Sequence, residues 1–156
     1  MSLGRAFPEN LRKESVKRNL VPGSVIRFSS KMDDGFVHIK RFVVLRCDED
    51  TFTVVINSEI NPILQKPELL ISQVSMPKSD HDFMDRDSNI DCTRVRTFST
   101  AELIDTLIDT DGWFLGKITD QVRDQMLAAL KQARTLSAVS VKELCESLEK
   151  ADLNQP

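Results

Sequence analysis

The stretch that decides the architecture is Arg86–Thr97, which reads RDSNIDCTRVRT and is followed at once by Phe98 and Ser99. It packs three arginines, two aspartates and a cysteine around a short strand-like run. Charge this dense beside β-forming residues is costly to bury, so we expect the stretch at the rim of a sheet or at a functional site. After Phe98 the apolar period changes from two to about 3.6, which predicts strands before this point and helices after it.

Alternating apolar residues predict the strands of this chain. They cover residues 24–30, 36–47, 51–57, 69–76 and, within the opening stretch, 89–97. Asp34-Gly35 is a turn signal that makes a hairpin of the first two strands. In the second strand Arg41 has the parity of Val37, Ile39 and Val43, which should face the core. We therefore expect a β-bulge near Arg41, or a place for Arg41 at the rim of the sheet.

Helix signals lie at both ends of the chain. Helices are predicted over 8–19, from Ser99 to about residue 108, from about residue 120, and from Ser140. Capping boxes (S-x-x-E) begin at Ser99 and Ser140, and Thr119 or Asp120 caps the helix between them. Residues 113–116 are expected to be an apolar connector docked on the sheet. The predicted fold class is α+β with a mainly β core, a small bent sheet or barrel with a helical arm at each end.

Composition describes one ordinary globular domain. The 156 residues, 40% apolar and 29% charged, suffice for one hydrophobic core. No apolar run is long enough to span a bilayer, and the first ten residues lack the apolar segment of a secretory signal. Cys47, Cys92 and Cys145 are an odd number without CxxC spacing, so we expect reduced thiols and a cytoplasmic protein.

Charge is distributed unevenly although the net charge is only -3. Residues 11–46 hold nine Lys/Arg and three Asp/Glu, whereas residues 80–91 hold five Asp and one Arg. A basic N-terminal third is typical of a surface that faces an anion, with the acidic loop turned away. An ordinary solvated surface is the alternative explanation.

Several classes of chemistry find no motif in this chain. The two histidines, His38 and His81, have neither zinc spacing nor a calcium-loop context, and there is no glycine-rich phosphate loop or nucleophile elbow. We therefore expect no metal and no cofactor. The remaining polar groups at strand ends are Arg41, Asn57, Ser58, Thr93, Arg94 and Arg96. Arginines with hydroxyl and amide donors suit a phosphodiester, and structural ion pairs are the alternative.

Four pieces of the sequence, in order, resemble the MazF/PemK toxin family. The strings RDSNI at 86–90 and VRT at 95–97 resemble that family's "RDS-x-I" strand and its "R-T" lead into a helix. PGSVI at 22–26 resembles its opening strand, and RFVVL at 41–45 its "RPVLV" strand. LGKI at 115–118, with the helix that follows, resembles its closing segment. The similarity covers about residues 21–135, with helical extensions at 1–20 and 136–156.

The resemblance implies a small SH3-like barrel with C-terminal helices. It implies a homodimer, inhibited by an antitoxin peptide, that cleaves single-stranded RNA without metal or cofactor. In such a reaction a ribose 2'-hydroxyl attacks the adjacent phosphate, which requires a proton acceptor, a proton donor and a cation. Arg41 stands at the family's catalytic arginine, and Asn57 and Ser58 stand where the family often has a threonine and its neighbour. Lys40, Arg94 and Arg96 are the expected RNA contacts.

The sequence also departs from that family's pattern. Asp91 and Thr93 stand where some members place an arginine and an aspartate, so a charge is reversed and a carboxylate is lost. Phe42 replaces the usual proline. His38, with an unperturbed pKa of about 6.5, is a candidate substitute base, although strand parity sets it opposite Arg41. A non-catalytic barrel that binds RNA or a protein partner is therefore the alternative function, and a structural or regulatory dimer is a third.

Overall fold

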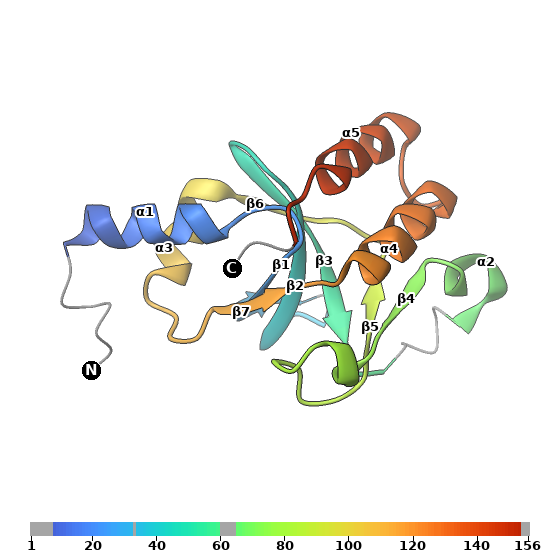
Figure 1. The fold of residues 1–156 in the computed structure, drawn as a ribbon, viewed down its shortest axis with the longest axis horizontal. Coiled ribbons are helices and arrows are strands. Elements are labelled where there is room, and N and C mark those ends of the chain that lie inside the picture. Colours follow the sequence, from blue (N-terminus) through green and yellow to red (C-terminus); the bar gives the residue numbers. More distant parts are fainter. Residues whose placement is uncertain (1–7, 33, 60–64, 154–156) are drawn as a thin grey trace.

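The protein is described by a computed structural model that covers residues 8–32, 34–59 and 65–153. Figure 1 shows a central sheet with helices on two sides, α1 and α3 on one and α4 and α5 on the other. The elements are α1 (Glu9–Asn19), β1 (Ser24–Lys31), β2 (Val37–Cys47), β3 (Asp50–Asn57), α2 (Pro67–Leu70), β4 (Gln73–Met76), a 3₁₀ turn (Lys78–Asp80), β5 (Ser88–Asp91), β6 (Arg96–Ser99), α3 (Thr100–Leu107), β7 (Phe114–Lys117), α4 (Asp120–Gln132) and α5 (Ala138–Glu149).

The strands of the described residues form one antiparallel sheet in the order β4-β5-β3-β2-β1-β7, with β6 paired to the first half of β3. Its register shifts between Val44 and Arg46 where β2 meets β3, and between Val25 and Ile26 where β1 meets β7. Such irregularities bend a strand and increase its twist. The sheet is therefore curled into a half-barrel, and the predicted α+β class with a mainly β core is confirmed at this level.

Both faces of the curled sheet are covered, because successive side chains of a strand point to opposite faces. In β2, Val43 and Leu45 join a core with α4 and α5, whereas Phe42 and Val44 join a core with α1 and α3. This arrangement explains the continuous apolar run at 42–45, in which all four side chains are buried. The terminal helices contribute to the two cores as well, since α1 supplies residues to one and α5 to the other.

Three phenylalanines from β1, β2 and β6 pack against one another inside the curled sheet. The Phe28 and Phe42 rings stack with centroids 4.9 Å apart. Phe98, which comes from β6, meets both rings edge-on, with centroids 5.3 Å from Phe28 and 5.7 Å from Phe42. The cluster therefore links β1 and β2 to a strand that pairs only with β3 in the described part of the chain.

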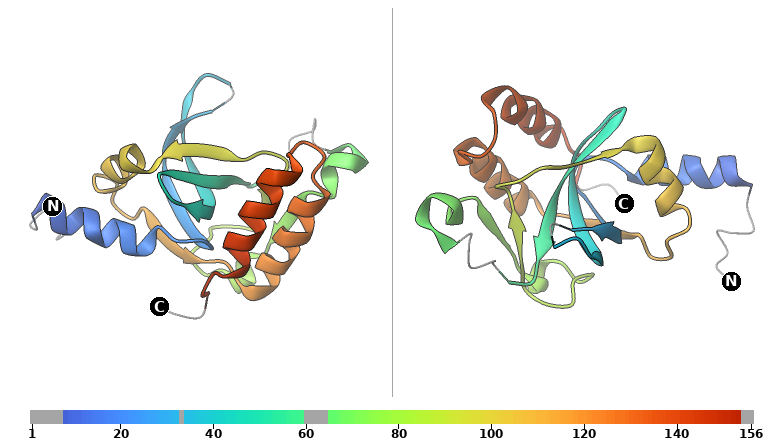
Figure 2. Two further views of the ribbon diagram at one scale, coloured as in Figure 1. Left: turned by 90° about the horizontal axis from the view of Figure 1, so that it is seen from above. Right: turned by 180° about the vertical axis from the view of Figure 1, so that it is seen from behind.

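The outer half of the β1–β2 hairpin projects from the body, as the left view of Figure 2 shows. Among the described residues, pairing of β2 with β3 ends at Arg41, and pairing of β1 with β7 ends at Ile26. Val37 and Ile39 are 67% and 64% exposed, and Phe36 at the turn is 70% exposed. The expectation that Val37 and Ile39 would share a buried face with Val43 is therefore wrong, because no element among the described residues packs over them.

The expected bulge at Arg41 is absent. Arg41 pairs regularly with Arg27 on one side and with Ile56 on the other, and the shift in β2 comes later, around Leu45. Arg41 lies at the rim of the sheet instead, which was the alternative expectation. It occupies the last pair of the β2–β3 ladder, and its side chain is 30% exposed.

Three further expectations about strands are corrected. Residues 67–70 form the short helix α2 with Pro67 in its first turn, which leaves only 73–76 of the strand predicted over 69–76. The strand predicted over 89–97 is two strands, β5 and β6, which both pair with β3 and are separated by residues 92–95. The predicted connector at 113–116 is mostly strand β7, which pairs with β1.

Helix starts follow the side chains that satisfy their first N–H groups. The hydroxyl of Ser99 accepts from the Glu102 N–H at the start of α3, and that of Thr119 accepts from the Val122 N–H at the start of α4, as expected. In α5 the cap is Ser137, whose hydroxyl accepts from the Ser140 N–H. The helix therefore begins one turn before the predicted capping box, because a serine three residues earlier already serves as the cap.

Candidate nucleic-acid interface

Two of the predicted cationic residues, Lys40 and Arg41, lie in the stem of the projecting hairpin. In the register of β1 and β2, Arg27 lies opposite Arg41 and Phe28 lies opposite Lys40. Residues directly opposite in an antiparallel pair share a face, so Arg27 and Arg41 lie on one face of the stem and Lys40 on the other. The two predicted neighbours, Lys40 and Arg41, therefore serve different surfaces.

Arg41 is held by a carboxylate from a distant loop. Its Nη2 donates to Asp85 Oδ2 at 2.8 Å, with 30% of the Arg41 side chain and 74% of the Asp85 side chain exposed. Arg41 Nε is buried and has no hydrogen-bond partner among the described residues. The guanidinium thus keeps donor capacity beyond its one ion pair.

On the opposite face Lys40 and Asn57 are joined. Lys40 Nζ donates to Asn57 Oδ1 at 3.1 Å, and Asn57 is the register partner of Asn89 in β5. Ser58 follows as an exposed residue beyond the end of β3. The structure therefore brings Lys40, Asn57 and an additional amide, Asn89, together, whereas Arg41 emerges from the other side of β2.

Asp91 and Thr93 form a buried turn. Asp91 Oδ1 accepts from Gln73 Nε2 at 2.8 Å, from the Thr93 N–H at 3.0 Å and from the Thr93 hydroxyl at 2.5 Å. The Thr93 carbonyl in turn accepts from the Thr135 hydroxyl. These bonds shape residues 92–95, where the chain passes from β5 to β6. Both side chains are thereby committed to the backbone of the turn.

Arg94 and Arg96 follow this turn. Arg94 is exposed, and Arg96 lies opposite Thr53 in the β3–β6 pair, where the Thr53 hydroxyl donates to the Arg96 carbonyl at 3.0 Å. Arg96 shares its face with Phe98, two residues further along β6, and thus with the aromatic core. It therefore lies on the same face as Lys40 and Asn57, as the register of β2, β3 and β6 requires.

His38 lies near the tip of the hairpin, away from these groups. Its Nε2 is 2.7 Å from Asp34 Oδ2, and both side chains are about half exposed. The Phe36 N–H first, and the His38 ring second, lower the pKa of Asp34 from its usual value. No bulge separates His38 from Arg41 in the β1–β2 register, so His38 has the parity of Lys40, as expected from the sequence.

Two groups of this region did not stand out in the sequence. Arg27 alternates with apolar residues in its strand, and counting back from the Asp34-Gly35 turn would have placed it near Arg41. Asp85 gave no such signal, since its partner lies 44 residues away.

The second histidine, His81, is buried: its Nδ1 lies 2.9 Å from the Pro77 carbonyl, and its Nε2 accepts from the Thr119 N–H. No grouping suited to a metal ion occurs among the described residues.

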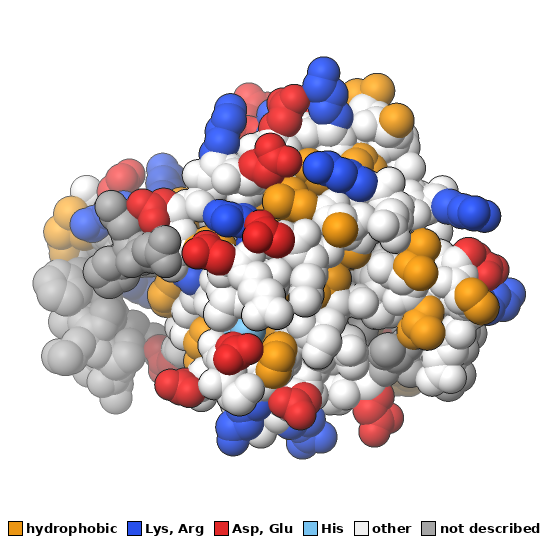
Figure 3. Space-filling view, turned by 45° about the vertical axis from the view of Figure 1, so that its right-hand side comes forward, with side chains coloured by type: hydrophobic (Ala, Val, Ile, Leu, Met, Phe, Trp, Pro, Cys, Tyr) orange, Lys and Arg blue, Asp and Glu red, His pale blue; other side chains and the backbone are white. Residues whose placement is uncertain are grey.

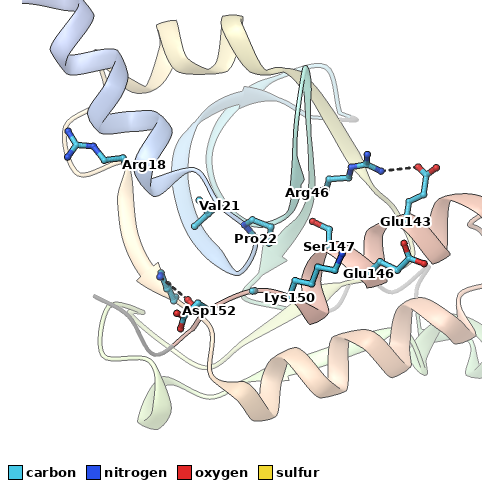
Figure 4. A pocket seen from close by; sticks show the side chains of 11 residues that line it. Arg18, Val21, Pro22, Arg46, Glu143, Glu146, Ser147, Lys150 and Asp152 are labelled. Carbon is cyan, nitrogen blue, oxygen red and sulfur yellow. Dashed lines mark hydrogen bonds and ion pairs between the residues drawn. The ribbon is translucent and has the colours of Figure 1, made fainter.

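A separate cavity of about 800 Å³ lies between α5 and the segment that leads into β1 (Figure 4). Arg46 Nη1 donates to Glu143 at 3.0 Å, and Lys117 Nζ donates to the Asp152 carbonyl at 3.0 Å. The lining of this cavity includes both basic and acidic side chains, and none of the residues predicted as a site. We therefore do not assign the predicted chemistry to it.

The face seen in Figure 3 has no continuous cationic track, because Lys/Arg and Asp/Glu side chains are interspersed over it. In the described part of the chain, no helix has the length and apolar character needed to cross a bilayer. Comparison of the sequence with protein-family models and with curated proteins finds no match.

Proposed function

We propose that this protein binds single-stranded RNA along the stem of its β1–β2 hairpin. The observation that carries the proposal is the placement of Arg27, Lys40 and Arg41 around a projecting hairpin whose outer part exposes Phe36 and Ile39. Guanidinium and ammonium groups bind phosphates, and exposed apolar side chains provide surfaces for unstacked bases. A single-stranded RNA chain carries both groups, phosphates and unstacked bases.

The wider setting is proposed on the resemblance to the MazF/PemK family. We propose an SH3-like barrel, which the curled sheet and its linking phenylalanine cluster support. A homodimer, an inhibitory antitoxin peptide and a cytoplasmic location belong to the same proposal. The exposed apolar residues of the hairpin support a peptide partner. The three free cysteines support the cytoplasmic location.

Binding is tested with a fluorescently labelled single-stranded RNA and the variant Lys40→Gln. We expect weaker binding for the variant and a slope of log affinity against log salt smaller by about 0.7, since one phosphate contact is lost. Lys142→Gln is the matched control, because Lys142 is an exposed lysine of α5. Equal binding by both variants, or no RNA binding by the wild type, would refute the proposal.

Metal-independent RNA cleavage is the second candidate function, favoured by Arg41. A half-buried guanidinium with one exposed carboxylate partner is suited to stabilise charge on a phosphorane. A proton acceptor is less well supported, because Asp91 is committed to its turn and His38 lies on the opposite face from Arg41. The test is incubation with RNA in the presence of a chelator. Cyclic-phosphate ends that vanish in Arg41→Ala support the enzyme, and binding without cleavage leaves the RNA-binding module.

A further inference from the structure

Two arginines are directly opposite each other in the stem, and one of them is paired with a carboxylate. Arg27 and Arg41 are direct register partners in β1 and β2. Like charges directly opposite across a strand pair destabilise it. Arg41 has its ion pair with Asp85, whereas Arg27 has no carboxylate within ion-pair distance among the described residues. The three side chains together carry one net positive charge, so the site still attracts an anion.

Asp85 reaches Arg41 from a loop that is anchored on both sides. On one side of Asp85, His81 and Met84 are buried, with 1% and 2% exposure. On the other side, the Asp87 carboxylate accepts from the Lys78 N–H at 2.9 Å. Asp85 itself remains largely in water. An exposed ion pair of this kind is weak, because water and salt compete with it, so the carboxylate is readily replaced.

We propose that Arg27 and Arg41 form a phosphodiester subsite and that Asp85 occupies it, as a replaceable carboxylate, in the free protein. This rests on the RNA-binding function proposed above. A phosphate accepts parallel hydrogen bonds from a guanidinium fork, whereas Asp85 takes one bond from one nitrogen of Arg41. RNA binding therefore requires displacement of Asp85.

The same face also explains why a nucleotide suits the subsite better than a simple anion. Ile39 and Val37 continue the strand outward from Arg41 with the same parity, and both are exposed. A phosphate between the arginines thus places its attached sugar and base beside apolar side chains. Burial of that apolar surface adds affinity that an inorganic ion cannot gain.

The test compares four variants for binding of labelled single-stranded RNA. Asp85→Asn should bind about two- to five-fold more tightly, because the competing carboxylate is gone. Arg27→Gln should bind at least about five-fold more weakly, because charge-assisted hydrogen bonds are lost. Asp109→Asn is the matched control for the added charge, since Asp109 is 70% exposed and pairs with Arg12 at 3.2 Å. Arg18→Gln is the control for a lost arginine, and both controls should bind like the wild type.

A second readout separates this proposal from the RNA-binding function. Inorganic pyrophosphate should shift the Nε–H NMR signals of Arg27 and Arg41, at lower concentration in Asp85→Asn than in Asp109→Asn. If those shifts occur but RNA does not bind, the subsite stands and the RNA function falls. If RNA binds but Arg27→Gln matches Arg18→Gln and pyrophosphate leaves both arginines unmoved, the subsite is overturned. Loss of both responses overturns both proposals.

Discussion

Replacement of Phe42 by leucine tests the phenylalanine cluster that joins β6 to the hairpin stem. Phe42 is fully buried and contacts two other rings, Phe28 by stacking and Phe98 edge-on. Each such pair contributes about 0.5–1.5 kcal/mol beyond the burial of its area. Loss of both pairs should therefore lower the free energy of unfolding by about 1–3 kcal/mol, before any residual cavity adds to it.

Urea denaturation followed by circular dichroism measures this change, with the slope of the transition unchanged between variants. Phe36→Leu is the matched control, because the Phe36 ring is 70% exposed and the same substitution there should alter stability by less than about 0.5 kcal/mol. A double-mutant cycle of Phe42→Leu with Phe98→Leu should give a coupling energy of about 0.5–1.5 kcal/mol. A coupling near zero would mean that β6 does not close the half-barrel against β2.

Two further predictions concern titratable groups. Burial raises the pKa values of the Cys92 and Cys145 thiols, so a thiol reagent should label only the half-buried Cys47 in the native protein and all three cysteines after denaturation; rapid native labelling of Cys92 would contradict the structure. The hydrogen bond from the Phe36 N–H lowers the pKa of the Asp34 carboxyl below its usual value of 3.8. This bond therefore stabilises the hairpin tip fully above pH 3.8, and the stabilisation is lost as the pH falls through the lowered pKa. The Phe36 amide NMR signal should therefore titrate below pH 3.8, and a midpoint at or above that value would refute the assignment.

Local signals predicted most elements of the fold, because turns and caps depend on a few adjacent residues. The Asp34-Gly35 turn, the Ser99 and Thr119 caps and the alternation in β1–β3 are all local. The predictions were wrong where packing against other elements decides whether a residue is buried. Val37 and Ile39 alternate like core residues, yet nothing covers them in the described part of the chain. Whether a patterned strand is buried depends on the reach of its neighbours, which periodicity alone does not contain.

The candidate site was only partly predictable for a related reason. Residue types suited to phosphate were recognised, but their grouping depends on parity and on distant loops. Lys40 and Asn57 meet because they have the same parity in paired strands. Asp91 was a candidate for catalysis, yet its Oδ1 accepts the Thr93 N–H and stabilises a turn. The Arg41–Asp85 pair is non-local, so no spacing rule would find it.

The two-sided arrangement of the stem favours one kind of ligand. Lys40 and Arg41 lie on opposite faces of β2, and beyond Arg41 the edge of β2 that faced β3 has no strand paired to it in the described residues. A ligand that contacts both cations must therefore pass around that edge. A single strand can make such a turn because its backbone is flexible, whereas duplex DNA is stiff, with a persistence length of about 50 nm. The geometry of the hairpin stem thus supports the proposed single-stranded ligand, whichever base the exposed apolar residues contact.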